Sequence, residues 1–115
     1  MNIKISFHNM PHSDPMEHHI RAKLVKISEI LQGQADATPF NIEVWLKANK
    51  LHPHHRVEIH VKTPIVDLHA HDEGTDMYIA ADNAIDKMVA LIRKDKERMR
   101  DKFQRPETDK KKFSR

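Results

Sequence analysis

Residues 56–71 read RVEIHVKTPIVDLHAH, in which apolar and polar side chains alternate on both sides of Thr63-Pro64. This alternation predicts two β-strands, each with one apolar and one polar face. The same pattern predicts a strand over residues 42–46 and another over residues 3–7. Short connections between the last three strands indicate an antiparallel sheet with one face exposed to water.

Two amphipathic helices are predicted, one after the first strand and one after the last. Asp14-Pro15 is expected to start the first helix, with Asp14 as its cap, and Gly33 is placed to stop it. Thr75 is expected to cap the second helix, which begins near Asp76. The apolar stripe of the first helix consists of Met16, Ile20, Leu24, Ile27 and Leu31, and that of the second consists of Met77, Ala81, Ile85, Met88 and Ile92.

The predicted order of elements is β-α-β-β-β-α, which places the chain in the α+β class. We expect one four-stranded sheet with two helices packed on its apolar face. A right-handed crossover through the first helix makes the first two strands parallel if they are neighbours. The 115 residues suffice for one domain, which is assigned to residues 1–103. Residues 104–115 contain Pro106 and several lysines and are expected to form a disordered basic tail.

Charge is distributed unevenly along the chain. Residues 1–86 contain 8 Lys and Arg against 12 Asp and Glu, whereas residues 87–115 contain 12 against 5. A positive potential concentrated in one region suits a polyanionic partner. The alternative interpretation of this charge distribution is a solvated helix face followed by a basic tail, with no polyanionic partner.

The composition argues against a membrane protein, a disulfide-rich protein and an enzyme. No apolar run is long enough to span a bilayer, and the first residues lack the apolar segment of a signal peptide. The absence of Cys excludes disulfides and thiolate chemistry, and it fits a reducing cytosol. Gly33 and Gly74 form no phosphate-binding loop, and no serine or carboxylate pair has a catalytic arrangement. We therefore expect a cytoplasmic protein with no catalytic residue, no cofactor and no small-molecule substrate.

The ten histidines are the most unusual feature of the composition. Strand alternation places His60, His69 and His71 on the polar face of the sheet, with Glu58 and Asp67 nearby. Imidazole and carboxylate groups within reach of each other could hold Zn²⁺ or Ni²⁺. No spacing here matches a dedicated metal motif, so solvated polar residues are the favoured interpretation and no metal is expected. A metal- or pH-sensing binding module remains an alternative function.

Basic residues form a stripe on each predicted helix. The stripes consist of His19, Lys23 and Lys26 on the first helix and of Lys87, Lys94 and Arg98 on the second. If the helices pack side by side, the two stripes could border one extended surface that tracks successive phosphates. Trp45 is expected to face away from the helices and Tyr78 to lie near the buried stripe, so neither is placed to stack on bases. This favours recognition of the backbone and shape of structured RNA, and a general double-stranded-RNA binder is a further alternative.

The start of the second predicted helix carries a distinctive block, because residues 75–82 read TDMYIAAD. The block continues through Ile85-Asp86-Lys87 to Lys94, Lys96 and Arg98. Four other segments belong to the same pattern: the opening strand, Ala22-Lys23-Leu24, Lys26-Ile27 and Leu68-His69-Ala70. With these residues the chain resembles the ribosome hibernation-promoting factor family, which includes the ribosome-associated inhibitor. The resemblance covers residues 1–102.

The resemblance implies a short-form member of the family, with a domain similar to double-stranded-RNA-binding domains. Such a protein binds the small ribosomal subunit in the channel for mRNA and tRNA, near the decoding centre, and keeps idle ribosomes inactive. It is expected to be a monomer off the ribosome and to bind no membrane. The rRNA-binding residues carried over from the family are Lys23, Lys26, Lys87, Lys94, Lys96 and Arg98. The chain departs from the family pattern at Ala90, where an Arg is usual, and at Phe7-His8-Asn9-Met10, where a Gly- or polar-rich run is usual.

Overall fold

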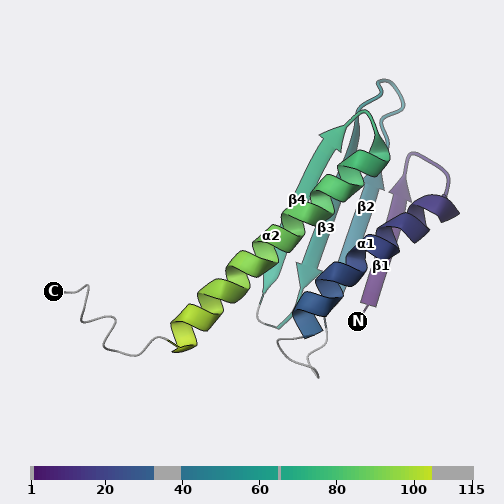
Figure 1. Cartoon of the computed structure of the whole chain (residues 1–115). Coiled ribbons are helices and arrows are strands. Elements are labelled where there is room, and N and C mark those ends of the chain that lie inside the picture. Colours follow the sequence, from purple (N-terminus) through teal and green to yellow (C-terminus); the bar gives the residue numbers. More distant parts are fainter. Residues whose placement is uncertain (1, 33–39, 65, 105–115) are drawn as a thin grey trace.

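The computed structural model describes residues 2–32, 40–64 and 66–104, apart from the side chains of residues 32, 96 and 98–104. Its elements are β1 (Asn2–His8), α1 (Asp14–Gln32), β2 (Asn41–Lys47), β3 (His55–Lys62), β4 (Asp67–Gly74) and α2 (Met77–Gln104). The predicted order β-α-β-β-β-α and the α+β class are therefore confirmed (Figure 1). Gly33 and residues 105–115 lie outside the described residues, so the helix stop and the basic tail stay predictions.

The four strands form one sheet in the order β1-β2-β3-β4. β1 and β2 are parallel, whereas β2 pairs antiparallel with β3, and β3 with β4. A parallel pair needs a crossover connection, and α1 supplies it. Both helices lie on the same face of the sheet, with α1 beside α2 and α2 across β3 and β4 (Figure 1). β4 is thus an edge strand next to α2 and away from α1.

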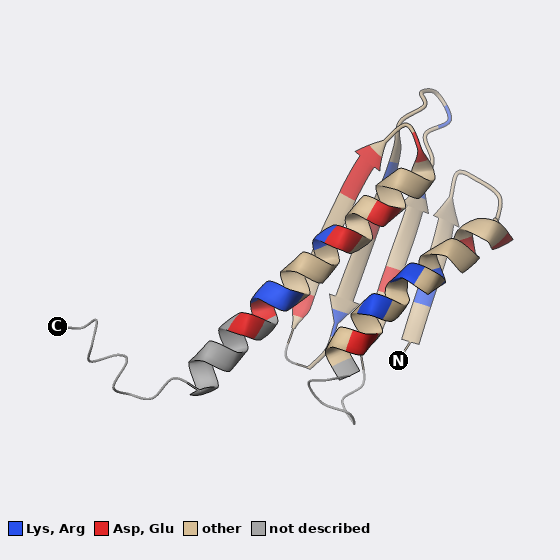
Figure 2. Cartoon of the chain, in the orientation of Figure 1, with Lys and Arg blue, Asp and Glu red and all other residues tan. Residues whose placement is uncertain are grey.

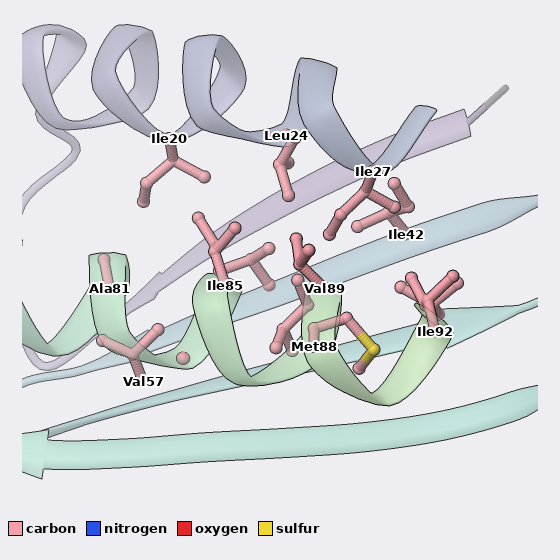
Figure 3. Packing of buried hydrophobic residues seen from close by; sticks show 14 of the residues in the cluster. Ile20, Leu24, Ile27, Ile42, Val57, Ala81, Ile85, Met88, Val89 and Ile92 are labelled. Atoms are coloured by element: carbon pink, nitrogen blue, oxygen red, sulfur yellow. The ribbon is translucent and has the colours of Figure 1, made fainter. Parts of the chain in front are cut away.

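The apolar face of the sheet forms the floor of the hydrophobic core. The inward side chains of β2 and β3 are at most 1% exposed, and they are Ile42, Val44, Leu46, Val57, Ile59 and Val61. Ile20, Leu24 and Ile27 of α1 face Ile85 and Val89 of α2 above this floor (Figure 3). Both predicted apolar stripes are confirmed, and Met77 is their one member that is partly rather than fully buried.

The cap of α1 is Ser13, so the prediction of Asp14 is wrong. The Ser13 hydroxyl accepts a hydrogen bond from the Met16 backbone N–H at 3.3 Å, and the Ser13 carbonyl accepts one from the Glu17 N–H at 3.0 Å. The Asp14 carboxylate instead lies 2.7 Å from Nε2 of His12. Two residues that can cap a helix stand next to each other here, and the apolar stripe alone does not decide between them.

The same one-residue difference occurs at α2, where the cap is Asp76 and not the predicted Thr75. The Asp76 carboxylate accepts hydrogen bonds from the backbone N–H groups of Tyr78 at 2.9 Å and Ile79 at 3.3 Å. A carboxylate at this position also interacts favourably with the positive end of the helix dipole. Asp76 therefore fixes where the helix with most of the candidate contacts begins.

Tyr78, which was predicted to lie near the buried stripe, lies at the surface beside that stripe. Its side chain is 40% exposed, and its ring packs edge-on against His19 with the ring centroids 5.1 Å apart. One residue of helix turns the side chain by about 100° from the direction of Met77, which removes it from the stripe. Trp45 lies on the outer face of the sheet, as predicted, because it alternates with the buried Val44 and Leu46.

Replacement of the α2 cap tests this assignment. Asp76→Ala should lower the free energy of unfolding by about 1 kcal/mol, because two helical N–H groups lose their acceptor. Thr75→Ala is the matched control, and as an exposed substitution it should change that free energy by less than about 0.5 kcal/mol. Urea unfolding followed by circular dichroism measures both variants, and equal losses would show that Asp76 is not the cap.

Candidate nucleic-acid interface

The candidate contacts of α1 are Lys23 and Lys26, which both lie outside the buried stripe of the helix. Lys26 is exposed and makes no ion pair with any residue that the structure describes. Lys23 is half-buried, and its Nζ lies 3.7 Å from the Asp86 carboxylate of α2. Lys23 therefore bridges the two helices, whereas Lys26 is available to a partner.

The flank of α2 that faces α1 is acidic. Asp86 contacts Lys23, and one turn earlier Oδ1 of Asp82 lies 2.6 Å from Nε2 of His19. His19, the third member of the predicted α1 stripe, is thus also held by a carboxylate. Positive charge along the junction of the helices is partly neutralised within the protein.

Lys87 and Lys94 lie on the other flank of α2, toward the edge strand β4. The Lys87 ammonium donates to the Asp72 carboxylate at 2.8 Å and to the His71 carbonyl at 3.0 Å. Lys87 and Lys94 border a hollow of about 440 Å³ between α2 and β4, and Ala90 lines it between them. Lys94 is exposed and, within the described part of the chain, makes no ion pair.

The predicted stripes thus form two patches, which we call the α1 patch (Lys23 and Lys26) and the α2 patch (Lys87 and Lys94). The acidic flank of α2 lies between them, so the structure does not join them into one continuous basic surface (Figure 2). The two helices pack side by side, which is the condition under which one extended basic surface was predicted. Helical periodicity places Lys87 on the polar side of α2, but it does not show on which flank of α2 the first helix packs.

Further basic residues follow the α2 patch along the same helix. Lys96 and Arg98 belong to α2, but their side chains lie outside the described parts, so their role stays a prediction. Arg93 is exposed and directly precedes Lys94. The stripe pattern did not select Arg93, although the density of basic residues in this segment was a signal that could have found it.

Two hydrogen bonds hold the carboxylate that partners the α2 patch. The bond from Lys87 at 2.8 Å lowers the pKa of Asp72, and a bond from the Asn83 amide at 3.2 Å acts in the same direction. Exposed ion pairs of this kind contribute about 0–1 kcal/mol each. A phosphate can therefore replace Asp72 as the partner of Lys87, or Asp86 as the partner of Lys23, at small cost.

The outer face of the sheet carries a separate group of charged side chains. Arg56 donates to the Glu58 carboxylate at 2.6 Å, and this hydrogen bond lowers the pKa of Glu58. His60 and His69 are register partners on β3 and β4, and their rings stack with the centroids 4.0 Å apart. The shared face that alternation predicted for these two histidines is confirmed, but alternation alone does not indicate that the rings stack.

Comparison with known proteins shows the family of the chain. The model of the family described as "Sigma 54 modulation protein / S30EA ribosomal protein" matches residues 3–100. The chain belongs to this family. The match confirms the resemblance to ribosome hibernation-promoting factors, and the family is one of ribosome-associated factors rather than a known class of enzymes.

Solved structures of two proteins resemble the fold closely. The N-terminal domain of Protein Y from Thermus thermophilus has a TM-score of 0.68 and 23% identity, with 82% of this chain and 98% of that one covered. A ribosomal subunit interface protein from Coxiella burnetii has a TM-score of 0.69 and 27% identity, with 84% and 99% covered. A search of curated protein sequences found no match.

In the part of the chain that the structure describes, neither helix is apolar enough over a sufficient length to cross a membrane.

The Lys87–Asp72 pair should make a pH-dependent contribution to stability. Because the pKa of Asp72 is lower in the folded protein than its ordinary value of 3.8, the folded state binds this proton less tightly than the unfolded chain. The stabilisation is then fully present above pH 3.8 and is lost as the pH falls through the folded pKa. Asp72→Asn should lower the free energy of unfolding near pH 7, with the difference from wild type shrinking in acid.

Urea unfolding at a series of pH values measures this difference. Lys87→Gln is the matched variant, since it removes the other half of the pair and should raise the pKa of Asp72 toward its ordinary value. A difference between wild type and Asp72→Asn that stays constant from pH 7 into acid would contradict the assignment.

Proposed function

We propose that this protein is a ribosome hibernation factor. It binds rRNA of the small subunit in the channel for mRNA and tRNA, near the decoding centre, and keeps idle ribosomes inactive in the cytoplasm during stress. The observation that carries the proposal is the family match over residues 3–100, which includes both helices with candidate contacts. The similar structure of a ribosomal subunit interface protein from Coxiella burnetii supports the same partner.

The proposed mechanism is occupation of the channel and requires no chemical step. The exposed ammonium groups of Lys26 and Lys94 are available to rRNA phosphates at once. Lys23 and Lys87 exchange a carboxylate for a phosphate on binding. Lys96 and Arg98 continue the series along α2. A bound protein then excludes mRNA and tRNA because it fills their space.

Recognition of phosphates and shape suits this surface better than base reading. The candidate side chains are lysines and an arginine on two helices that a shared core holds in fixed positions. Trp45 lies on the outer face of the sheet, away from both patches, and the Tyr78 ring packs against His19. Ala90 stands in the hollow where the family usually has an Arg, so we assign the affinity of the α2 patch to the flanking Lys87 and Lys94.

Neutralising the α2 patch tests the proposed interface. Lys87→Gln with Lys94→Gln should weaken binding to small ribosomal subunits and should flatten its salt dependence. The log–log slope is expected to fall by roughly 0.7–0.9 for each phosphate that the variant no longer binds. Cosedimentation at several salt concentrations measures both quantities.

The control is the double variant Lys4→Gln with Lys50→Gln, which removes the same charge from exposed lysines of β1 and of the loop after β2. It should retain the wild-type affinity and slope. Equal losses in the two double variants would show that net charge, and not the α2 patch, governs binding. Displacement from the subunit by an excess of unrelated RNA duplex would favour a general double-stranded-RNA binder.

Residues 1–103 are proposed as the ribosome-binding domain and residues 104–115 as a tail that assists encounter. Charges at the end of a chain accelerate association more than they slow dissociation, because long-range attraction acts before specific contacts form. Deletion of residues 104–115 should lower the association rate at low salt and leave the dissociation rate nearly unchanged. Stopped-flow binding measures both rates, and a truncated protein that associates normally but dissociates many times faster would make the tail a docking element.

A further inference from the structure

Three ligand-type side chains converge on the outer face of the sheet, opposite the helices. They are His60 of β3 and Asp67 and His69 of β4, and no two of their ligand atoms are more than 4.8 Å apart. His60 Nε2 lies 2.5 Å from Asp67 Oδ1, and His69 Nε2 lies 3.5 Å from the same oxygen. None of the three is a proposed rRNA contact, and His69 lines the hollow that Lys87 and Lys94 border.

Backbone structure fixes the positions of all three side chains. His60 and His69 are direct register partners, and Asp67 precedes His69 by two residues and so projects from the same face of β4. The turn between the strands is closed by the Thr63 N–H, which donates to the Val66 carbonyl at 2.8 Å. The cluster therefore needs no ordering of a loop before it can bind a ligand.

The distances and donor types fit a divalent transition metal ion. Bonds of about 2.0–2.2 Å to imidazole nitrogen and carboxylate oxygen place two ligands of a tetrahedral site roughly 3.4 Å apart. The His69–Asp67 separation of 3.5 Å already has this value, and the shorter His60–Asp67 separation has to open by about one ångström. Two imidazoles and one carboxylate form a donor set that Zn²⁺ accepts, with the remaining position open to water.

One ring has to turn before both histidines can share an ion. The rings are nearly parallel, at 6°, and stack with the centroids 4.0 Å apart, whereas a metal lies close to the plane of each ring that binds it. The His69 side chain is 70% exposed, so its ring can rotate about its own bonds without disturbing the core. Lys62, the register partner of Asp67, is also exposed, and its ammonium can move into solvent.

We propose that His60, Asp67 and His69 form a surface site for a divalent transition metal ion of the Zn²⁺ type, which links β3 to β4. The site lies on the face of the sheet that the helices do not cover, and of its three residues only His69 also lines the hollow between β4 and α2 that Lys87 and Lys94 border. A bound ion would tie the edge strand to the sheet through side chains. It would therefore stabilise the folded protein in proportion to its occupancy.

Calorimetric titration of the full chain with Zn²⁺ tests the proposal. We expect one equivalent to bind, and His60→Ala, Asp67→Asn and His69→Gln should each weaken the affinity by at least about tenfold, since even residues that only support a metal ligand contribute roughly 10–100-fold. Zn²⁺ should raise the melting temperature of wild type but not of His69→Gln, whose exposed position leaves the fold intact. Ribosome cosedimentation of Asp67→Asn should match wild type, because Asp67 does not line the hollow that the α2 patch borders.

The matched control is His18→Ala with His52→Ala, which removes two exposed histidines that are not part of the cluster. This variant should bind Zn²⁺ like wild type. Equal loss of affinity in the control would mean that scattered surface histidines take up the metal, and unchanged binding by His60→Ala or His69→Gln would exclude the site. Zn²⁺ uptake that occurs only with self-association, followed by sedimentation velocity, would place the ion between copies of the chain and would also overturn the proposal.

Discussion

The apolar face of the sheet has to be covered completely, and one helix is too narrow to do so. Four strands spaced about 4.8 Å apart span roughly 14 Å, whereas a helix with its side chains is roughly 10 Å wide. Two helices side by side satisfy this requirement, and their contact with each other follows from it. The groups that can meet a partner are then confined to the flanks and outer sides of the helices and to the outer face of the sheet.

The packing of the helices also decides how their charges are arranged. Where α1 meets α2, Lys23 and His19 find carboxylates within the same protein, whereas Lys26 and Lys94 do not within the described residues. The proposed binding to rRNA is then partly an exchange of partners. Each exchange contributes little free energy of binding, so a partner must offer several phosphates in the right places at once. This requirement favours a folded RNA with a fixed backbone over a loose polyanion.

Much of the fold can be predicted from the spacing of apolar residues, because a helix or strand that is buried on one face needs apolar side chains at a regular spacing. The structure buries the apolar faces that the alternation in β3 and β4 predicts, and it buries the apolar stripes from Met16 to Leu31 and from Met77 to Ile92. The spacing of apolar residues does not decide which of two adjacent polar residues caps a helix. Ser13 and Asp14 can both cap a helix, and so can Thr75 and Asp76, so only the hydrogen bonds of the folded chain distinguish them.

The candidate site was harder to predict than the fold for a related reason. A helical pattern tells which residues face water, but not which neighbouring element lies along each flank. Lys87 was therefore correctly placed at the surface, yet its direction toward β4 and its bond to Asp72 depend on the packing of the whole domain. The stacked pair of His60 and His69 similarly depends on the register between two strands.

The bond from Lys87 to the His71 carbonyl has a consequence for solubility. An edge strand offers unpaired main-chain groups to any other strand, and proteins commonly guard such edges with lysine. Lys87 places a charged group over the main chain of β4, at the end of the sheet opposite β1. If an rRNA phosphate draws Lys87 away, as proposed, the ribosome itself would have to shield the edge. The same side chain thus discourages strand-to-strand aggregation while the protein is free in solution.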